Sequence, residues 1–226
     1  MKVLILAAGI GSRLGARIPK ILVEVGGKTI LSRHAESLAV VGISPGEVTV
    51  VTGYRSEDVS NSCRTLGMRT IYNPRWRTPG TFSSFFVLPS TDSPLLIIHG
   101  DLVWEAGLAL GSLESRGDVV VPVDPRNRAD PEAMKAEVRG NRLLHLSKLL
   151  PVSRSAGESM GMFLIRNHGL LRRLSASLAD DPQASFDDAV NLAAGSFRVV
   201  PWITDKFVWE EVDTPDDLAT AESKFS

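Results

Sequence analysis

Apolar runs of strand length alternate with helix-length segments along the first half of this chain, and this alternation restricts its fold most strongly. Continuous apolar runs bounded by turn residues are typical of a parallel sheet covered by helices on both faces. The runs are at 2–8, 47–52, 69–72, 95–99 and 118–123, and helical spacing occupies 30–41 before Gly42, 56–66 and 105–115. This order predicts β-α-β-α-β-α-β-α-β, an α/β fold in three layers.

The second half of the sequence predicts a different arrangement. Segments 135–139 and 143–146 flank a Gly-Asn turn and predict a β-hairpin. Further elements are expected as a strand at 159–166, helices at 167–178 and 185–194, strands at 197–201 and 207–212, and a closing helix at 215–224 capped by Thr214. We expect one domain over 1–226, an α/β/α sandwich with a mixed, mostly parallel, Rossmann-like sheet.

Composition narrows the classes of function. The 226 residues include 25 basic and 26 acidic ones, for a net charge of −1. No overall field therefore favours nucleic acid or an anionic membrane. No apolar run reaches the ~20 residues of a membrane-spanning helix, and the N-terminal segment is typical of a first strand, not a signal peptide. The chain has one cysteine, Cys63, which excludes an internal disulfide, and we therefore expect a cytoplasmic protein. The sequence does not determine the oligomeric state.

A glycine-rich segment directly after the first strand is the sharpest local motif. It reads Leu6-Ala7-Ala8-Gly9-Ile10-Gly11-Ser12-Arg13-Leu14-Gly15 and is followed by Pro19-Lys20. Backbone N–H groups in such a turn can bind phosphate, and Arg13 and Lys20 add positive charge. A dinucleotide fingerprint needs a long helix after the glycines, which Pro19 and the strand-like run 21–25 exclude. Gly27-Lys28-Thr29 imitates the end of a P-loop, but Leu22 stands where that motif requires Gly.

The segment from Leu6 to Lys20 resembles the signature of nucleotidyltransferases that activate sugar phosphates and other phosphorylated alcohols. Four more segments match that family in order: His99-Gly100-Asp101, Leu146-Ser147-Lys148, the strand containing Gly161, and Val212-Asp213 before the last helix. The stretches 73–76 and 80–84 resemble in particular the bacterial phosphocholine and phosphonate cytidylyltransferases. The Gln-Pro-x-Gly segment of the hexose-phosphate enzymes is absent.

The resemblance implies a transfer of CMP from CTP to a small phosphate or phosphonate acceptor, with Mg²⁺ as cofactor and pyrophosphate as the second product. In this interpretation 1–124 binds the nucleotide and 125–226 binds the acceptor. Arg13 would hold the leaving pyrophosphate and Lys20 the α-phosphate, while Asp101 and Asp213 would supply the carboxylate oxygens that Mg²⁺ prefers. The residues implied for nucleotide binding are Leu6, Ala7, Ala8, Gly9, Gly11, Ser12, Arg13, Lys20, Gly80 and Ser84.

The acceptor is expected among residues of the second half. Lys148 would meet its phosphate, near Lys135 and Gly161, and Glu158 is placed to meet an ammonium or hydroxyl group. We expect an acceptor of the phosphocholine, aminoethylphosphonate or hydroxyethylphosphonate type, because a site for a hexose phosphate needs several side-chain amides and carboxylates, and this half is poor in amides. Two other functions are a sugar-1-phosphate nucleotidyltransferase that uses UTP or dTTP, and a non-catalytic nucleotide-binding homologue.

Several candidate residues also have simpler structural interpretations. Asp101 can cap a strand end, Asp213 can belong to the cap of the last helix, and Lys148 can be a solvated hairpin lysine. His34 lies on an apolar helical face and is predicted to be a core residue. Six aromatic residues have two interpretations: they form a cage around a quaternary ammonium group, or they are scattered core positions. They are Trp76, Trp104, Trp202, Trp209, Phe163 and Phe207.

Overall fold

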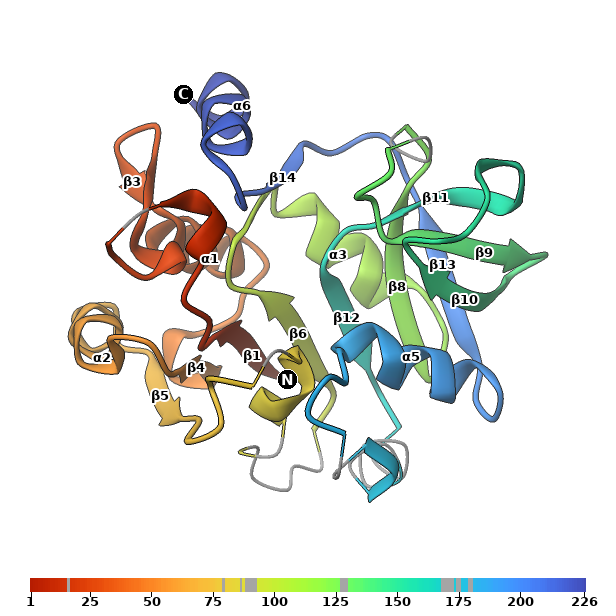
Figure 1. Cartoon of the computed structure of the whole chain (residues 1–226), viewed down its shortest axis with the longest axis horizontal. Coiled ribbons are helices and arrows are strands. Elements are labelled where there is room, and N and C mark those ends of the chain that lie inside the picture. The colour runs from red at the N-terminus through yellow and green to blue at the C-terminus, as the bar shows by residue number, and fades with distance from the viewer. Residues whose placement is uncertain are drawn as a thin grey trace.

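The computed structural model describes residues 1–15, 17–78, 80–85, 87, 93–126, 130–167, 173, 176–178 and 181–226. Ten strands of this described part form one sheet. They are β1 Lys2–Ala7, β4 Val48–Thr52, β5 Arg69–Tyr72, β6 Leu95–His99, β8 Val119–Asp124, β9 Lys135–Arg139, β10 Arg142–Ser147, β11 Ser155–Ser159, β12 Met162–Ile165 and β13 Val199–Ile203. The spatial order is β10-β9-β11-β8-β12-β6-β1-β4-β5, with β13 beside β8 (Figure 1).

The sheet is mixed and mostly parallel, as the sequence predicts. Strands β5, β4, β1 and β6 are all parallel neighbours. Strand β12 is antiparallel to both β6 and β8, so β8 and its parallel neighbour β13 run in the direction of β1. The predicted hairpin is present as β9 and β10, and β11 joins it to β8. Figure 1 shows this hairpin on the opposite side of the molecule from β5.

Helices cover both faces of the sheet and complete the three predicted layers. The described α-helices are α1 Ile30–Val40, α2 Ser56–Thr65, α3 Gly107–Glu114, α5 Phe186–Ala194 and α6 Pro215–Phe225. Buried apolar side chains of α1, α2 and α3 share one core with the inward residues of β1, β4 and β6. Those of α5 share a second core on the other face. Helix α6 packs by Ala221 against the segment that follows the glycine loop.

The helix boundaries follow local signals that the sequence predicts. Thr29 caps α1 by accepting from the Ser32 backbone N–H at 3.1 Å, and Gly42 adopts a left-handed φ of 77° just after it. Thr214 caps α6 and Asp217 returns the capping bond to the Thr214 backbone N–H at 2.8 Å. Each cap satisfies backbone groups that the helix end leaves without a partner.

Four expectations need correction. The run 21–25 is a 3₁₀ helix, Lys20–Leu22, followed by the short hairpin of β2 Glu24–Val25 and β3 Lys28–Thr29. The strand predicted at 159–166 is the shorter β12, because Gly161 has a left-handed φ of 63° that breaks the extended chain; β11, which ends at Ser159, was not predicted. Between β5 and β6, where the predicted order places a helix, the described part contains a 3₁₀ helix, Thr81–Phe85. Two strands of three residues pair with each other outside the main sheet: β7 Leu102–Trp104 and β14 Trp209–Glu211. The sequence predicts no strand at β7, and it predicts a longer strand, 207–212, at β14.

The predicted helix 167–178 lies largely outside the described residues. Within the described part, no helix combines the length and the apolar character needed to cross a bilayer. Arg55 has the one left-handed backbone among the described non-glycine residues, with φ 45° and ψ 45° at the start of α2. This conformation costs an L-residue about 1–2 kcal/mol.

Candidate active site

A cleft of about 600 Å³ opens at the carboxyl ends of β1 and β6. The chain passes from β1 to β4 on one side and later returns to place β6 on the other side of β1. Open α/β sheets bind ligands at such a reversal of strand order, beyond the carboxyl ends of the strands. Gly9 follows β1 and Asp101 follows β6, and both line the cleft. The topology therefore brings two of the predicted motifs to one place.

The glycine loop gives Lys20 a route into this cleft. Gly11 has a left-handed φ of 67°, and a Cβ added to it would lie 2.4 Å from Lys20 Cγ. The aliphatic part of Lys20 therefore crosses the loop where a side chain would obstruct it. Between them, the 3₁₀ helix Ser12–Leu14 carries Arg13, which also lines the cleft, while Leu14 is buried.

Two carboxylates converge on the two cations of the loop. Lys20 Nζ is 3.0 Å from Asp101 Oδ2 and also pairs with Asp213 Oδ1, and Arg13 pairs with Asp213 Oδ2. Burial acts to raise the pKa of Asp101, but Lys20 and His99 outweigh it and hold that pKa below its ordinary value. Thr214 and Asp217 make the capping bonds of α6, so the Asp213 carboxylate is not used for capping.

These carboxylates fit a divalent metal ion. Lys20 Nζ contacts an oxygen of each, which shows that the two groups can share one cation. Mg²⁺ binds hard oxygen ligands and often uses one or two carboxylates together with phosphate oxygens. Asp101 and Asp213 are the residues that would hold it.

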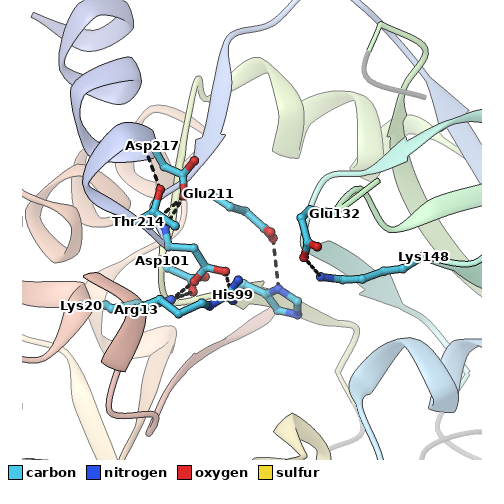
Figure 2. A network of polar contacts seen from close by, with 10 residues as sticks. Arg13, Lys20, His99, Asp101, Glu132, Lys148, Glu211, Thr214 and Asp217 are labelled. Carbon is cyan, nitrogen blue, oxygen red and sulfur yellow. Dashed lines mark hydrogen bonds and ion pairs between the residues drawn. The ribbon is translucent and has the colours of Figure 1, made fainter. Parts of the chain in front are cut away.

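On the other side of the cleft, a lysine and a glutamate form a pair. Lys148 Nζ is 3.1 Å from Glu132 Oε2 (Figure 2). Lys135 does not line the cleft: its side chain is buried, and its Nζ donates to the Lys148 carbonyl at 3.0 Å. Lys135 therefore supports the backbone that carries Lys148.

His99 and Glu211 lie between these two sides of the cleft (Figure 2). His99 Nδ1 is 3.3 Å from Glu211 Oε1, and Gly161 leaves room for this pair, because an added Cβ would lie 2.4 Å from the same oxygen. Burial acts to lower the pKa of His99, but Glu211 together with the carboxylates of Asp187 and Asp101 raises it to about 9. Burial raises the pKa of Asp187 to about 6, with His99 acting in the opposite direction.

Carboxylates outnumber cations in the cleft. Its described cationic side chains are Arg13, Lys20, Lys148 and, with its raised pKa, His99. Its carboxylates belong to Asp101, Asp130, Glu132, Glu158, Asp187, Glu210, Glu211, Asp213 and Asp217. Such a cleft needs counter-cations before it can bind a polyanion.

Most of the residues that the sequence singles out line this cleft. They are Leu6, Ala7, Gly9, Gly11, Arg13, Lys20, Asp101, Lys148, Glu158, Gly161 and Asp213. The structure does not bring Ala8, Ser12, Gly80, Ser84 or Lys135 to it. Gly80 is packed against the chain before α5, since an added Cβ would lie 2.3 Å from the Ala184 carbonyl oxygen. The buried Ser84 hydroxyl accepts from Asn73 Nδ2 at 3.3 Å.

The aromatic rings do not assemble a cage among the described residues. Trp209 lines the cleft, and its Nε1 donates to Asp124 Oδ2 at 2.7 Å. Trp104 donates to the buried His34, which is a core residue as predicted. Trp202 packs against Phe207 with ring centroids 5.9 Å apart, and Trp76 packs near Tyr54.

His99, Glu211 and Asp187 are among the cleft residues to which the sequence assigned no role. A signal existed for two of them, because each lies two positions before a carboxylate that the sequence singles out. His99 is the last residue of β6, before Asp101, and Glu211 is the last residue of β14, before Asp213. Asp187 carries no such signal, since only the packing of α5 brings it to the cleft.

The glycine loop, the strand reversal and the paired carboxylates define a domain of the nucleotidyltransferase class. The sequence profile of the MobA-like NTP transferase domain matches residues 3–186. The chain belongs to this family.

Relatives and a solved structure agree with this assignment. The chain is 32% identical over 225 residues to "Bifunctional IPC transferase and DIPP synthase" of Rubrobacter xylanophilus, covering 96% of this chain and 50% of that protein. It is 30% identical to "CMP-5'-(3-aminopropyl)phosphonate synthase" of Streptomyces rubellomurinus, covering 100% of this chain and 39% of that protein. It therefore spans half or less of the length of these relatives. The inositol-1-phosphate CTP transferase of T. maritima shares the fold, with a TM-score of 0.79 at 22% identity over 99% of this chain and 95% of that one.

Proposed function

We propose that this chain is a Mg²⁺-dependent cytidylyltransferase that transfers CMP from CTP to a small phosphate or phosphonate and releases pyrophosphate. The observation that carries the proposal is the convergence of Arg13, Lys20, Asp101 and Asp213 in one cleft at the strand reversal. In this proposal one domain contains both functional halves, with 1–124 binding the nucleotide and 125–226 the acceptor.

The chemistry requires positioning and positive charge more than covalent catalysis. An oxygen of the acceptor attacks the α-phosphorus of the nucleotide, the bond to the β-phosphate oxygen breaks, and pyrophosphate leaves. Lys20 is placed for the α-phosphate, where charge develops, and Arg13 for the leaving pyrophosphate. Asp101 and Asp213 would hold Mg²⁺, which would supply positive charge to the phosphate oxygens.

The choice of CTP is supported by the names of two similar proteins. One relative is a CMP-phosphonate synthase, and the structural neighbour is a CTP transferase. Both names also describe acceptors with a phosphate or phosphonate group, for which Lys148 is the candidate ligand on the second side of the cleft.

The acceptor's other end is expected to carry hydrogen-bond donors. Glu158, Asp187 and Glu211 line the cleft and present acceptor oxygens. The Ser159 hydroxyl is buried at the same cleft, and no partner for it exists in the part of the chain that the structure describes. Buried polar atoms normally have a partner, so this hydroxyl is suited to a polar ligand. An aminoalkyl or hydroxyalkyl tail meets these conditions.

A polyol phosphate is the second candidate acceptor. The expectation against a polyhydroxylated acceptor rests on the scarcity of amides, but the cleft offers carboxylates instead, and these accept hydrogen bonds from hydroxyl groups. The structural neighbour from T. maritima is described as acting on inositol 1-phosphate.

The test is pyrophosphate release with Mg²⁺, each of the four NTPs, and a panel of acceptors. The panel contains phosphocholine, aminoethylphosphonate, aminopropylphosphonate, hydroxyethylphosphonate, inositol 1-phosphate and glucose 1-phosphate. We expect CTP to exceed the other nucleotides by at least about tenfold in kcat/KM, a difference of ~1.4 kcal/mol. If inositol 1-phosphate has a kcat/KM at least tenfold above the other acceptors, the polyol phosphate is the acceptor. If glucose 1-phosphate has the highest kcat/KM, with UTP or dTTP as the nucleotide, the chain is a sugar-1-phosphate nucleotidyltransferase and both candidates are wrong. Nucleotide binding without turnover on the whole panel contradicts the enzyme and indicates a binding homologue.

A further inference from the structure

The segment between β4 and α2 holds the glycine loop at both of its limbs. The Tyr54 backbone N–H donates to the Ala8 carbonyl at 3.0 Å, on the limb that leaves β1. Arg55 Nη1 donates to the Arg17 carbonyl at 2.6 Å, on the limb that leads to Lys20. Gly53 allows this close approach, since an added Cβ would lie 2.5 Å from the Ala8 carbonyl oxygen.

Arg55 reaches the loop from a backbone conformation that glycine or asparagine adopts more readily. Its φ of 45° is left-handed, and it precedes α2 without making a side-chain cap bond. Strained backbone of this kind persists where the surrounding structure requires it, and it often marks a functional position. Here the side chain spans to a loop 38 positions earlier in the sequence.

We infer that Arg55 is a positioning residue that fixes the second limb of the glycine loop and thereby the places of Arg13 and Lys20. Arg13 and Lys20 lie on either side of Arg17 in the sequence, and both line the cleft. A guanidinium bond to the carbonyl between them restricts the movement of the loop that carries both cations. This inference rests on the proposed function for its catalytic consequence only.

The second contact of Arg55 does not explain its conformation. Its Nε is 2.5 Å from Asp58 Oδ2, but both side chains are about two-fifths exposed. Ion pairs at that exposure contribute little to stability. If Arg55 had no role beyond the left-handed backbone and this ion pair, glycine would replace it with no loss of stability; the bond to the Arg17 carbonyl is what glycine would remove.

The experiment compares Arg55→Gly and Arg55→Lys with the unmodified chain and with the control Arg64→Ala. Arg64 is an exposed arginine of the same helix, and its side chain bonds only Asn61 in the described part. For Arg55→Gly we expect an unchanged or higher Tm, because glycine relieves the left-handed strain. We also expect amide hydrogen exchange across 11–18 to rise at least about tenfold, as loss of a local tie lowers the opening free energy.

The catalytic readout is kcat and KM for pyrophosphate release. Small displacements of charged groups lower kcat, so Arg55→Gly is expected to lose at least about tenfold in kcat with a smaller change in KM. Arg55→Lys keeps a donor that can reach the Arg17 carbonyl and is expected to recover most of the kcat and of the exchange protection. Arg64→Ala is expected to remain within about threefold throughout, as usual for a surface substitution.

Two results overturn the inference. The first is amide hydrogen exchange over 11–18 that does not change in Arg55→Gly. The second is a loss of kcat that is the same in Arg55→Gly and Arg55→Lys and is accompanied in both by a lower Tm. If the unmodified chain releases no pyrophosphate from any nucleotide, the proposed function fails. The exchange measurement then still decides whether Arg55 fixes the loop.

Discussion

Asp101 lies just after β6, where its carboxylate meets Lys20 beside Arg13 and a second carboxylate, that of Asp213. Asp101→Asn keeps the size of the side chain and removes the charge of a metal ligand, which contributes several kcal/mol to a transition state of this kind. We expect the fold to remain and kcat/KM to fall by roughly 10²-fold or more, at 1.36 kcal/mol per tenfold. Circular dichroism and steady-state pyrophosphate release measure the two effects.

Asp216→Asn is the matched control for this substitution. Asp216 is an exposed aspartate in the first turn of α6, three residues from Asp213. It is expected to retain activity within about threefold, as surface changes usually do. Equal activities of the two variants remove Asp101 from the catalytic cluster.

His34 makes the stability of the protein depend on pH. Burial lowers its pKa to about 4, and its Nδ1 accepts a bond from Trp104 Nε1 at 2.9 Å, which requires a neutral ring. The unfolded chain takes up this proton near pH 6.5, so the stability that His34 provides is complete above pH 6.5 and is lost as the pH falls towards 4. We expect the unfolding free energy to be about 2 kcal/mol lower at pH 5 than at pH 7 because of this residue.

His34→Asn isolates that contribution. The asparagine Oδ1 takes the place of Nδ1 and can accept the same bond from Trp104, and the amide does not titrate. Urea unfolding of both proteins at pH 7 and pH 5 is expected to show that the unfolding free energy falls less at pH 5 in the variant than in the unmodified chain. Identical losses contradict the assignment, because carboxylates elsewhere contribute equally to both proteins.

At the scale of elements, α3 is an example of packing that overrides propensity. A Cβ added to Gly111 would lie 1.9 Å from Trp202 Cζ2. Alanine improves the helix by about 1 kcal/mol, but overpacking costs ~1–3 kcal/mol. We expect Gly111→Ala to lower the unfolding free energy by about 1–2 kcal/mol. Gly46→Ala is the control, since nothing lies within 4 Å of its added Cβ, and its stability is expected to change by less than ~0.5 kcal/mol.

Elements with their own local signals were predicted well from the sequence. The caps of α1 and α6 were read from Gly42 and Thr214, and the β9–β10 hairpin from its Gly-Asn turn. Strand β7 was missed, because three residues are too few to show a strand pattern; this strand forms by pairing with β14. The division at Gly161 was missed for a similar reason: the sequence marks a glycine, but only its tertiary surroundings require the left-handed turn.

At the scale of the whole molecule, the predicted binding of CTP with Mg²⁺ has a simple stability consequence. A ligand that binds only the folded state at 100 times its Kd adds about 2.7 kcal/mol. For a chain of this size that corresponds to a rise in Tm of roughly 5–10 °C. A thermal shift series with each NTP, with and without EDTA, measures it. Equal shifts for all four nucleotides, or a CTP shift that EDTA leaves intact, contradict the proposed site.

The candidate site was predictable to the extent that motifs mark strand ends. The loop with Arg13 and Lys20, and the strand end at Asp101, were identified in sequence, and the topology brings them together. Asp187 was not, because its position depends on how α5 packs over the sheet. Gly80 and Ser84 were implied by resemblance, and their backbone and hydroxyl groups are engaged in packing and hydrogen bonds away from the cleft.

The pairing of Lys20 with Asp213 also sets an order of events during synthesis. The two residues are 193 positions apart, and at ~5–20 residues per second the ribosome adds the second one on the order of 10–40 s after the first. Strands β4 and β6 are added within that interval and can pair with β1, while the glycine loop still lacks one of the two acids that Lys20 contacts. The strands that carry the glycine loop and Asp101 can therefore associate in a nascent chain before the second acid of the cluster exists.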